Sequence, residues 1–112
     1  MTPKTRTVIA GTLALLEQGH CTGVAARDKS GREVWGAHQD AVAWCASESL
    51  WEAARRIVVI DPDQRAAIVK TARETLEALL GIKSLVEAND AAPDLLRARI
   101  RALLTNRGLT NE

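Results

Sequence analysis

The chain has 112 residues, of which 46% are hydrophobic and 26% are charged, and its formal net charge is +1. This length suits one compact domain, expected over residues 1–112, and the apolar content excludes disorder of the whole chain. With 15 basic against 14 acidic residues, no overall field draws the protein to nucleic acid or to a membrane.

The aromatic residues are Trp35, Trp44 and Trp51, and the chain contains no Phe or Tyr. Ala, Val, Ile and Leu must therefore fill the core, and Ala and Leu are the strongest helix formers among them. We expect a mostly α fold of the α+β type, with four to five helices packed around a central helix. One small β-hairpin is expected between the first and second helices.

The first helix is predicted from near Thr5 to Gly19, because apolar residues recur there at helical spacing and Gly19 suits a left-handed C-cap. Residues of about 21–35 then alternate with a period of two, which predicts the hairpin. Its turn contains Asp28, which can bond the backbone ahead of it, and Gly31, which tolerates a positive φ.

The second helix is predicted to begin after an N-cap at Asp40 and to form the centre of the fold. Its expected buried face follows helical spacing, and Trp44, Trp51 and Val58 repeat every seven residues beside it. This prediction makes residues 42–57 a water-excluded rod with Cys45 more than a turn inside it. The buried face comprises Val42, Ala46, Leu50, Ala53 and Ile57.

The third helix has the clearest start, with Asp61 as N-cap and Pro62 at the first helical position, and Gly81 closes it. A short helix is predicted over 82–88 and a break over 89–93. Pro93 then opens a last helix that ends at Gly108 and leaves 109–112 as a frayed tail. The polar pairs at 61/63 and 89/90 are interpreted as helix-start caps rather than catalytic groups.

Three stretches together resemble a known family: 21–28 (CTGVAARD) with Gly31, 40–46 (DAVAWCA), and 89–91 (NDA) before an Ala/Leu/Arg helix. They are similar to small uncharacterised proteins of bacterial, largely actinobacterial, genomes and their phages. That family has a Gly-x-x-Ala-Arg-Asp hairpin, a Val-x-Trp-Cys-Ala helix and an Asn-Asp-Ala-Pro turn. As a domain of unknown function it implies a fold and a genomic setting but no activity. Pro93 lies one residue later than in the family pattern, and residues 47–49 are larger than expected, so no shared surface site is implied.

The chain holds a formal Cys₂His₂ set of His20, Cys21, His38 and Cys45. Its spacings do not match those of zinc sites, and adjacent residues on a strand point to opposite faces, so we expect no metal and no cofactor. The same residues define the alternative, a small Cys/His enzyme or metal-binding domain. In that alternative Cys45 is the nucleophile, His38 or His20 the base and Asp40 the orienting group. A buried, inert Cys45 is the preferred interpretation.

The apolar N-terminal run over 8–16 is too short to span a bilayer and shows no leader pattern, so we expect a cytoplasmic protein with reduced thiols. The function predicted is that of a non-enzymatic interaction protein that binds a macromolecular partner, most simply a protein. A phage-derived accessory or anti-defence factor is its specific form.

Four residues are the candidate binding residues: Trp35, Arg27, Arg97 and Arg101. Trp35 on the hairpin edge is either an anchor for the partner or a cover for the core. Arg27 is expected to pair with an acidic side chain across the hairpin. Arg97 and Arg101 make the last helix locally basic, which is typical of a solvated face or, less simply, of a surface that contacts phosphates.

Overall fold

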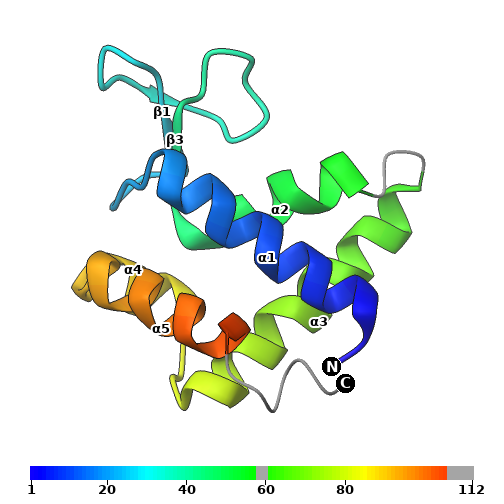
Figure 1. The fold of residues 1–112 in the computed structure, drawn as a ribbon. Coiled ribbons are helices and arrows are strands. Elements are labelled where there is room, and N and C mark those ends of the chain that lie inside the picture. The colour runs from blue at the N-terminus through cyan, green and yellow to red at the C-terminus, as the bar shows by residue number, and fades with distance from the viewer. Residues whose placement is uncertain (58–60, 106–112) are drawn as a thin grey trace.

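The computed structural model describes residues 1–57 and 61–105 of the chain (Figure 1). Within them lie five helices and a three-stranded sheet, which confirms a mostly α fold with a small β part. The helices are α1 (Pro3–Gln18), α2 (Ala46–Ile57), α3 (Pro62–Leu80), α4 (Leu85–Ala91) and α5 (Pro93–Thr105). The strands are β1 (Ala26–Arg27), β2 (Glu33–Val34) and β3 (Ala43–Trp44).

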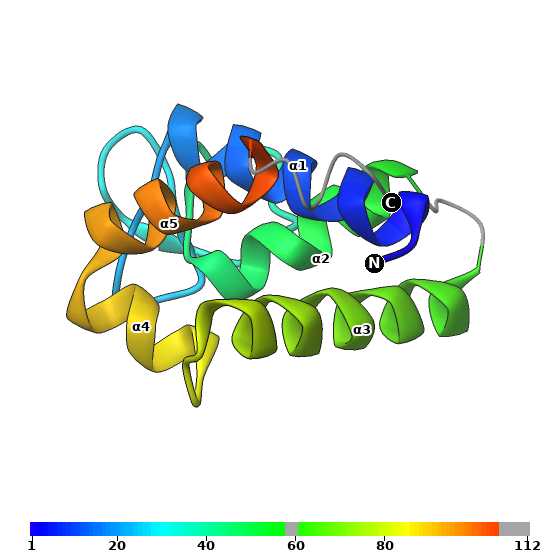
Figure 2. The same ribbon diagram turned by 60° about the horizontal axis from the view of Figure 1, so that its bottom comes forward.

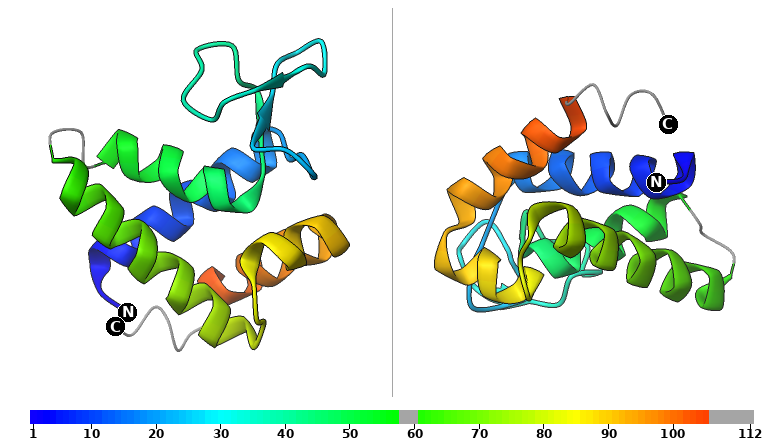
Figure 3. Two further views of the ribbon diagram at one scale, coloured as in Figure 1. Left: turned by 180° about the vertical axis from the view of Figure 1, so that it is seen from behind. Right: turned by 90° about the horizontal axis from the view of Figure 1, so that it is seen from below.

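The helices pack in layers around α2. Figure 2 shows α1 and α5 on one side and α3 and α4 on the other, with α2 between them, and Figure 3 shows the same arrangement from behind and from below. Helix α1 also contacts α3 directly. Each helix contributes a side chain with no solvent exposure to the shared core: Ile9, Leu50, Leu76, Leu85 and Ile100.

The sheet is antiparallel in the order β2-β1-β3, with Ala26 opposite Val34 on one side and Trp44 on the other. A parallel bridge joins His20 to Trp44 and adds the chain after α1 to the edge of β3. Ala26 is fully buried and Trp44 is 4% exposed, so the sheet contributes to the core through its central strand and β3. The loops around β1 and β2 extend beyond the helices, at the top of Figure 1.

Several predicted boundaries are confirmed. Asp61 caps α3, since its carboxylate accepts from the N–H groups of Asp63 and Gln64 at 2.9 and 3.3 Å. Gly81 follows α3 in the left-handed conformation with φ 67°, and Pro93 opens α5. Predictions for Val58, Gly108 and residues 109–112 lie outside the described residues.

The first helix begins at Pro3, earlier than predicted, because Thr2 caps it through the N–H of Thr5 at 3.2 Å. The left-handed C-cap predicted for Gly19 is wrong, since its φ of −170° is extended. The glycine is required there for space. A Cβ at Gly19 would lie 2.1 Å from the carbonyl oxygen of Val42.

The predicted helix start after Asp40 is wrong, and so is the buried rod over 42–57. Helix α2 begins at Ala46, and Val42 and Ile57 are 45% and 39% exposed. Residues 42–45 instead continue the sheet: the N–H groups of Val42 and Cys45 donate to Arg27 and Ala25 at 2.9 Å each. These long-range bonds occupy the backbone groups that a helix would have used.

Two further segments differ from the prediction. The first hairpin strand covers only Ala26–Arg27, and the loop before it contains Gly23 at φ 79°. The short helix lies at Leu85–Ala91, since Ser84 caps it by accepting from the N–H of Glu87 at 3.2 Å. Residues 89 and 90 therefore lie inside α4, and the interpretation of them as helix-start caps is wrong.

Candidate functional site

Trp35 is the most exposed large apolar side chain of the described residues, at 73% of its surface. It follows β2, the outer strand of the sheet, and its indole does not cover the core. The interpretation of Trp35 as a core cover is therefore wrong. Tryptophan buries a large area when it is covered and is enriched among the residues that dominate binding interfaces.

The backbone around Trp35 is held by hydrogen bonds, first through the pairing of the preceding Val34 with Ala26. The carbonyl oxygen of Trp35 accepts from the N–H of His38 at 3.0 Å, and that of Gly36 accepts from the buried Trp44 indole at 3.2 Å. A Cβ at Gly36 would lie 2.0 Å from the Glu48 side chain, so a larger residue would require that side chain to move. The exposed indole thus stands on a backbone that is already ordered.

His38 and Asp40 lie in the same loop and interact with each other. The ring Nδ1 of His38 accepts from the backbone N–H of Asp40 at 3.0 Å, and lies 3.9 Å from its carboxylate. Cys45, their proposed partner in the enzyme alternative, lies at the start of α2. Among the described residues, the hydrogen bonds of the His38 ring and of the Cys45 thiol go to different groups, and the lining of the pocket beside Cys45 includes no histidine.

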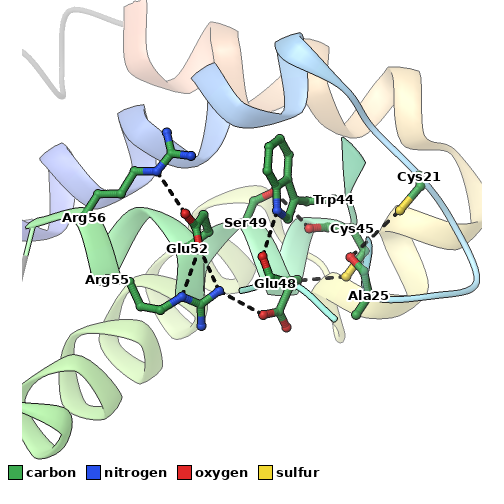
Figure 4. A network of polar contacts seen from close by, with 10 residues as sticks. Cys21, Ala25, Trp44, Cys45, Glu48, Ser49, Glu52, Arg55 and Arg56 are labelled. Atoms are coloured by element: carbon green, nitrogen blue, oxygen red, sulfur yellow. Dashed lines mark hydrogen bonds and ion pairs between the residues drawn. The ribbon is translucent and has the colours of Figure 1, made fainter. Parts of the chain in front are cut away.

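Cys45 is the residue immediately before α2, not a residue inside a helix (Figure 4). Its carbonyl oxygen accepts from the N–H of Ser49 at 2.9 Å, and its Sγ accepts from the N–H of Glu48 at 3.4 Å. The thiol lines a pocket of about 320 Å³ with nine lining residues. These are Gly23, Val24, Ala25, Cys45, Ser47, Glu48, Val86, Asn89 and Asp90.

A helix N-terminus usually favours a thiolate, but here burial raises the pKa of the Cys45 thiol. The N–H of Glu48 opposes this shift, and the Glu48 carboxylate adds to it. Glu48 itself is held by Arg55 at 3.2 Å, and so it stays close to the pocket (Figure 4). The arrangement keeps Cys45 protonated near neutral pH and does not activate it as a nucleophile.

His20 is held as a neutral imidazole between two helices. Its Nδ1 lies 2.7 Å from Nη1 of Arg97, and a guanidinium can only donate, so Nδ1 is the acceptor. Its Nε2 must then carry the proton, which it donates to Oδ1 of Asn89 at 2.5 Å. Burial lowers the pKa of His20, and the Arg97 charge lowers it further against the opposing effects of Asn89 and Asp94.

Asn89, predicted only as a helix-start cap, joins three parts of the chain and is 1% exposed. Its Oδ1 also accepts from the N–H of Ala46 at 2.9 Å, and its Nδ2 donates to the carbonyl oxygen of Cys21 at 3.1 Å. The next residue, Asp90, accepts from the N–H of Gly23 at 3.0 Å. The side chains of α4 therefore hold the loop after α1 against the start of α2.

The four candidate metal ligands are distributed over two places. Cys21 and Cys45 lie close together, and His20 is adjacent but occupied by Arg97 and Asn89, whereas His38 lies in the projecting loop. Among the described residues, no three His, Cys, Asp or Glu side chains are grouped so that they could hold a metal ion.

The candidate arginines are largely engaged in contacts within the protein. Nη1 of Arg27 donates to the carbonyl oxygen of Gly31 at 3.0 Å, a backbone acceptor in the hairpin turn. Arg97 pairs with Asp94 at 2.5 Å. Arg101 pairs with Glu17 at 2.7 Å. These contacts offset most of the positive charge expected on α5.

No protein-family model matches the chain, and no curated protein or solved structure matches it either. The protein is therefore described by its own fold and candidate site. It is a small, compact, mostly helical protein with a short antiparallel sheet from which a loop presents one tryptophan. No helix in the described part of the chain has the length and apolar content needed to cross a membrane.

Proposed function

We propose that this chain is a non-enzymatic binding protein and that Trp35 is the anchor of its contact with a protein partner. The observation that carries the proposal is the 73% exposure of the indole on an ordered loop. Tryptophan is among the residues that contribute most to protein interfaces, because it buries a large area and loses few rotamers on binding.

The structure of the loop supports this role. Ordering a loop on binding reduces affinity, but the backbone here is already held before Trp35 by the pairing of Val34 with Ala26 and after it by the Trp44 indole. The fitting partner surface is an apolar pocket wide enough for one indole. The neighbouring outer strand β2 offers backbone groups at the rim of the same surface.

A finer form of the proposal is a phage-derived accessory or anti-defence factor that acts in the bacterial cytoplasm. Its support is the resemblance of three short motifs to small bacterial and phage proteins. The alternative enzyme built on Cys45 and His38 has less support, because the two side chains lie in different places and burial raises the pKa of the Cys45 thiol.

The test compares the affinity of one partner for the parent protein with its affinity for matched variants. Capture with the tagged protein from its native cell supplies a candidate partner, whose affinity is then measured with both proteins purified. Trp35→Ala should weaken binding by roughly 30-fold, which corresponds to about 2 kcal/mol for an interface hot spot. Leu95→Ala is the control, because Leu95 is also apolar and 59% exposed but lies on α5. It should change the affinity less than about twofold.

Equal affinities of the Trp35→Ala variant and the parent protein for a partner that binds the parent specifically would refute the proposal. So would equal losses in the two variants, because the contact would then not be centred on the indole. Trp35→Ala is expected to stay folded, since an exposed side chain contributes little to the core.

A further inference from the structure

Cys21 and Cys45 are far apart in the sequence and neighbours in the fold. The N–H of Trp44 donates to Gly19 at 3.1 Å, and the N–H of Cys21 donates to Trp44 at 3.0 Å. These two bonds form the parallel bridge between His20 and Trp44. The bridge is isolated, but the residues that directly follow its two members lie near each other, and these residues are the two cysteines.

The carbonyl oxygen of Ala25 places the cysteines together by a second route. It accepts from the N–H of Cys45 at 2.9 Å and lies 3.9 Å from Sγ of Cys21. Figure 4 shows both sulfur atoms beside Ala25. Burial raises the pKa of the Cys21 thiol, and the proximity of Cys45 raises it further.

We propose that Cys21 and Cys45 form a reversible disulfide within the folded chain when the protein meets a low-molecular-weight disulfide such as oxidised glutathione. Neighbouring residues of paired strands have Cα atoms about 5 Å apart, within the range of about 4.4–6.8 Å that a disulfide bridges. Both thiols are free in the reduced protein described above.

The reaction proceeds in two exchanges. The thiolate of one cysteine attacks oxidised glutathione, forming a mixed disulfide and releasing one glutathione thiolate. The thiolate of the other cysteine then attacks the protein sulfur of the mixed disulfide, and the second glutathione leaves. The protein loses two protons and two electrons, which reduce one oxidised glutathione to two reduced molecules.

The bond would join the loop after α1 to the residue that precedes α2. Asn89 already holds these two segments together through Cys21 and Ala46, so oxidation reinforces an existing junction. It also withdraws the Cys45 thiol from the N–H of Glu48 and alters one wall of the pocket beside it. The inference does not depend on the proposed role of Trp35.

The native protein is incubated with oxidised glutathione at pH ~8.5, where ordinary thiols are partly ionised. After acid quenching, free thiols are alkylated and the protein is digested with trypsin. The expected product has lost two hydrogens, takes up no alkylating reagent and gives a cross-linked pair of peptides, 7–27 and 33–55, because trypsin cleaves after Lys and Arg. Its melting temperature should rise, since the bond closes a loop of the chain.

The control variants are Cys21→Ala and Cys45→Ala. Each should give a stable glutathione adduct or remain reduced, with no cross-linked peptide and no rise in melting temperature on oxidation. A parent protein that ends as a glutathione adduct or an interchain dimer would overturn the proposal. It is equally overturned if both thiols still alkylate after a cysteine peptide has been fully oxidised, or if the intrachain bond lowers the melting temperature.

Discussion

Replacing Asn89 with Ala should destabilise the protein more than any other single polar substitution among the described residues of α4. The side chain is 1% exposed and accepts from Ala46 and His20 while it donates to Cys21. Alanine is a better helix former than Asn, so local propensity favours the variant. Any loss of stability must therefore come from the partners that Asn89 leaves behind.

Two of these partners are buried backbone groups. Ala46 has no exposed surface and Cys21 is 7% exposed, so water does not reach the freed N–H and carbonyl oxygen without a local opening. An unpaired buried polar group costs about 1–3 kcal/mol, which gives a total loss of about 3–4 kcal/mol for the pair. A chain of this size has about 5–15 kcal/mol of stability in total, so the variant folds with a much reduced margin.

The assay is urea unfolding followed by Trp fluorescence, in which the buried Trp44 reports loss of the core. With a slope of about 1–1.5 kcal/mol per molar urea, the midpoint should fall by roughly 2–4 M. Asp90→Ala is the control, because this exposed neighbour bonds Gly23 and Asn89 among the described residues and should cost less than about 1 kcal/mol. A loss for Asn89→Ala no greater than that of the control would refute the reasoning.

Two further predictions concern His20 and Asp61. Burial and Arg97 hold the folded-state pKa of His20 below its ordinary value of 6.5, so the unfolded chain takes the proton first. The free energy of unfolding is then full above about pH 6.5 and falls as the pH drops toward the folded-state pKa. Urea midpoints measured across this pH range should show the fall. An equal fall in the His20→Gln variant would contradict this prediction. Asp61→Ala removes the cap of α3 and should cost about 1 kcal/mol by the same measurement. Glu74→Ala, at an exposed position inside α3, should stay within about 0.5 kcal/mol, and equal losses in the two variants would contradict the capping role.

The parts of the fold that could be predicted are those in which the signal lies within a few residues. Asp61 with Pro62 marks the start of α3, and Gly81 marks its end, because capping and the left-handed conformation depend on local chemistry alone. Pro93 marks the start of α5 for the same reason. The turn at Asp28 also formed as predicted, with its carboxylate accepting from the N–H groups of Ser30 and Arg32.

The start of α2 could not be found in this way, because it is decided by distant parts of the chain. Residues 42–45 have a pattern that suits a helix, yet their N–H groups bond to Arg27, Gly19 and Ala25. The first N–H of α2, that of Ala46, is then satisfied by Asn89 from α4. The spacing of apolar residues reports only local helix propensity, so it cannot predict where long-range strand pairing replaces the helix.

The geometry of the candidate site also depends on contacts between distant parts of the chain. Trp35 was a candidate on residue type, but its exposure depends on how Trp44 and Gly36 hold the loop away from the core. The nearness of the two cysteines follows from one parallel bridge between distant segments. The same junction around Ala46 and Cys21 thus determines where α2 begins, keeps the His20 imidazole neutral and brings the two cysteine sulfurs close together. A substitution at Asn89 should consequently change the thiol exchange as well as the stability, since it loosens the junction that brings the sulfurs together.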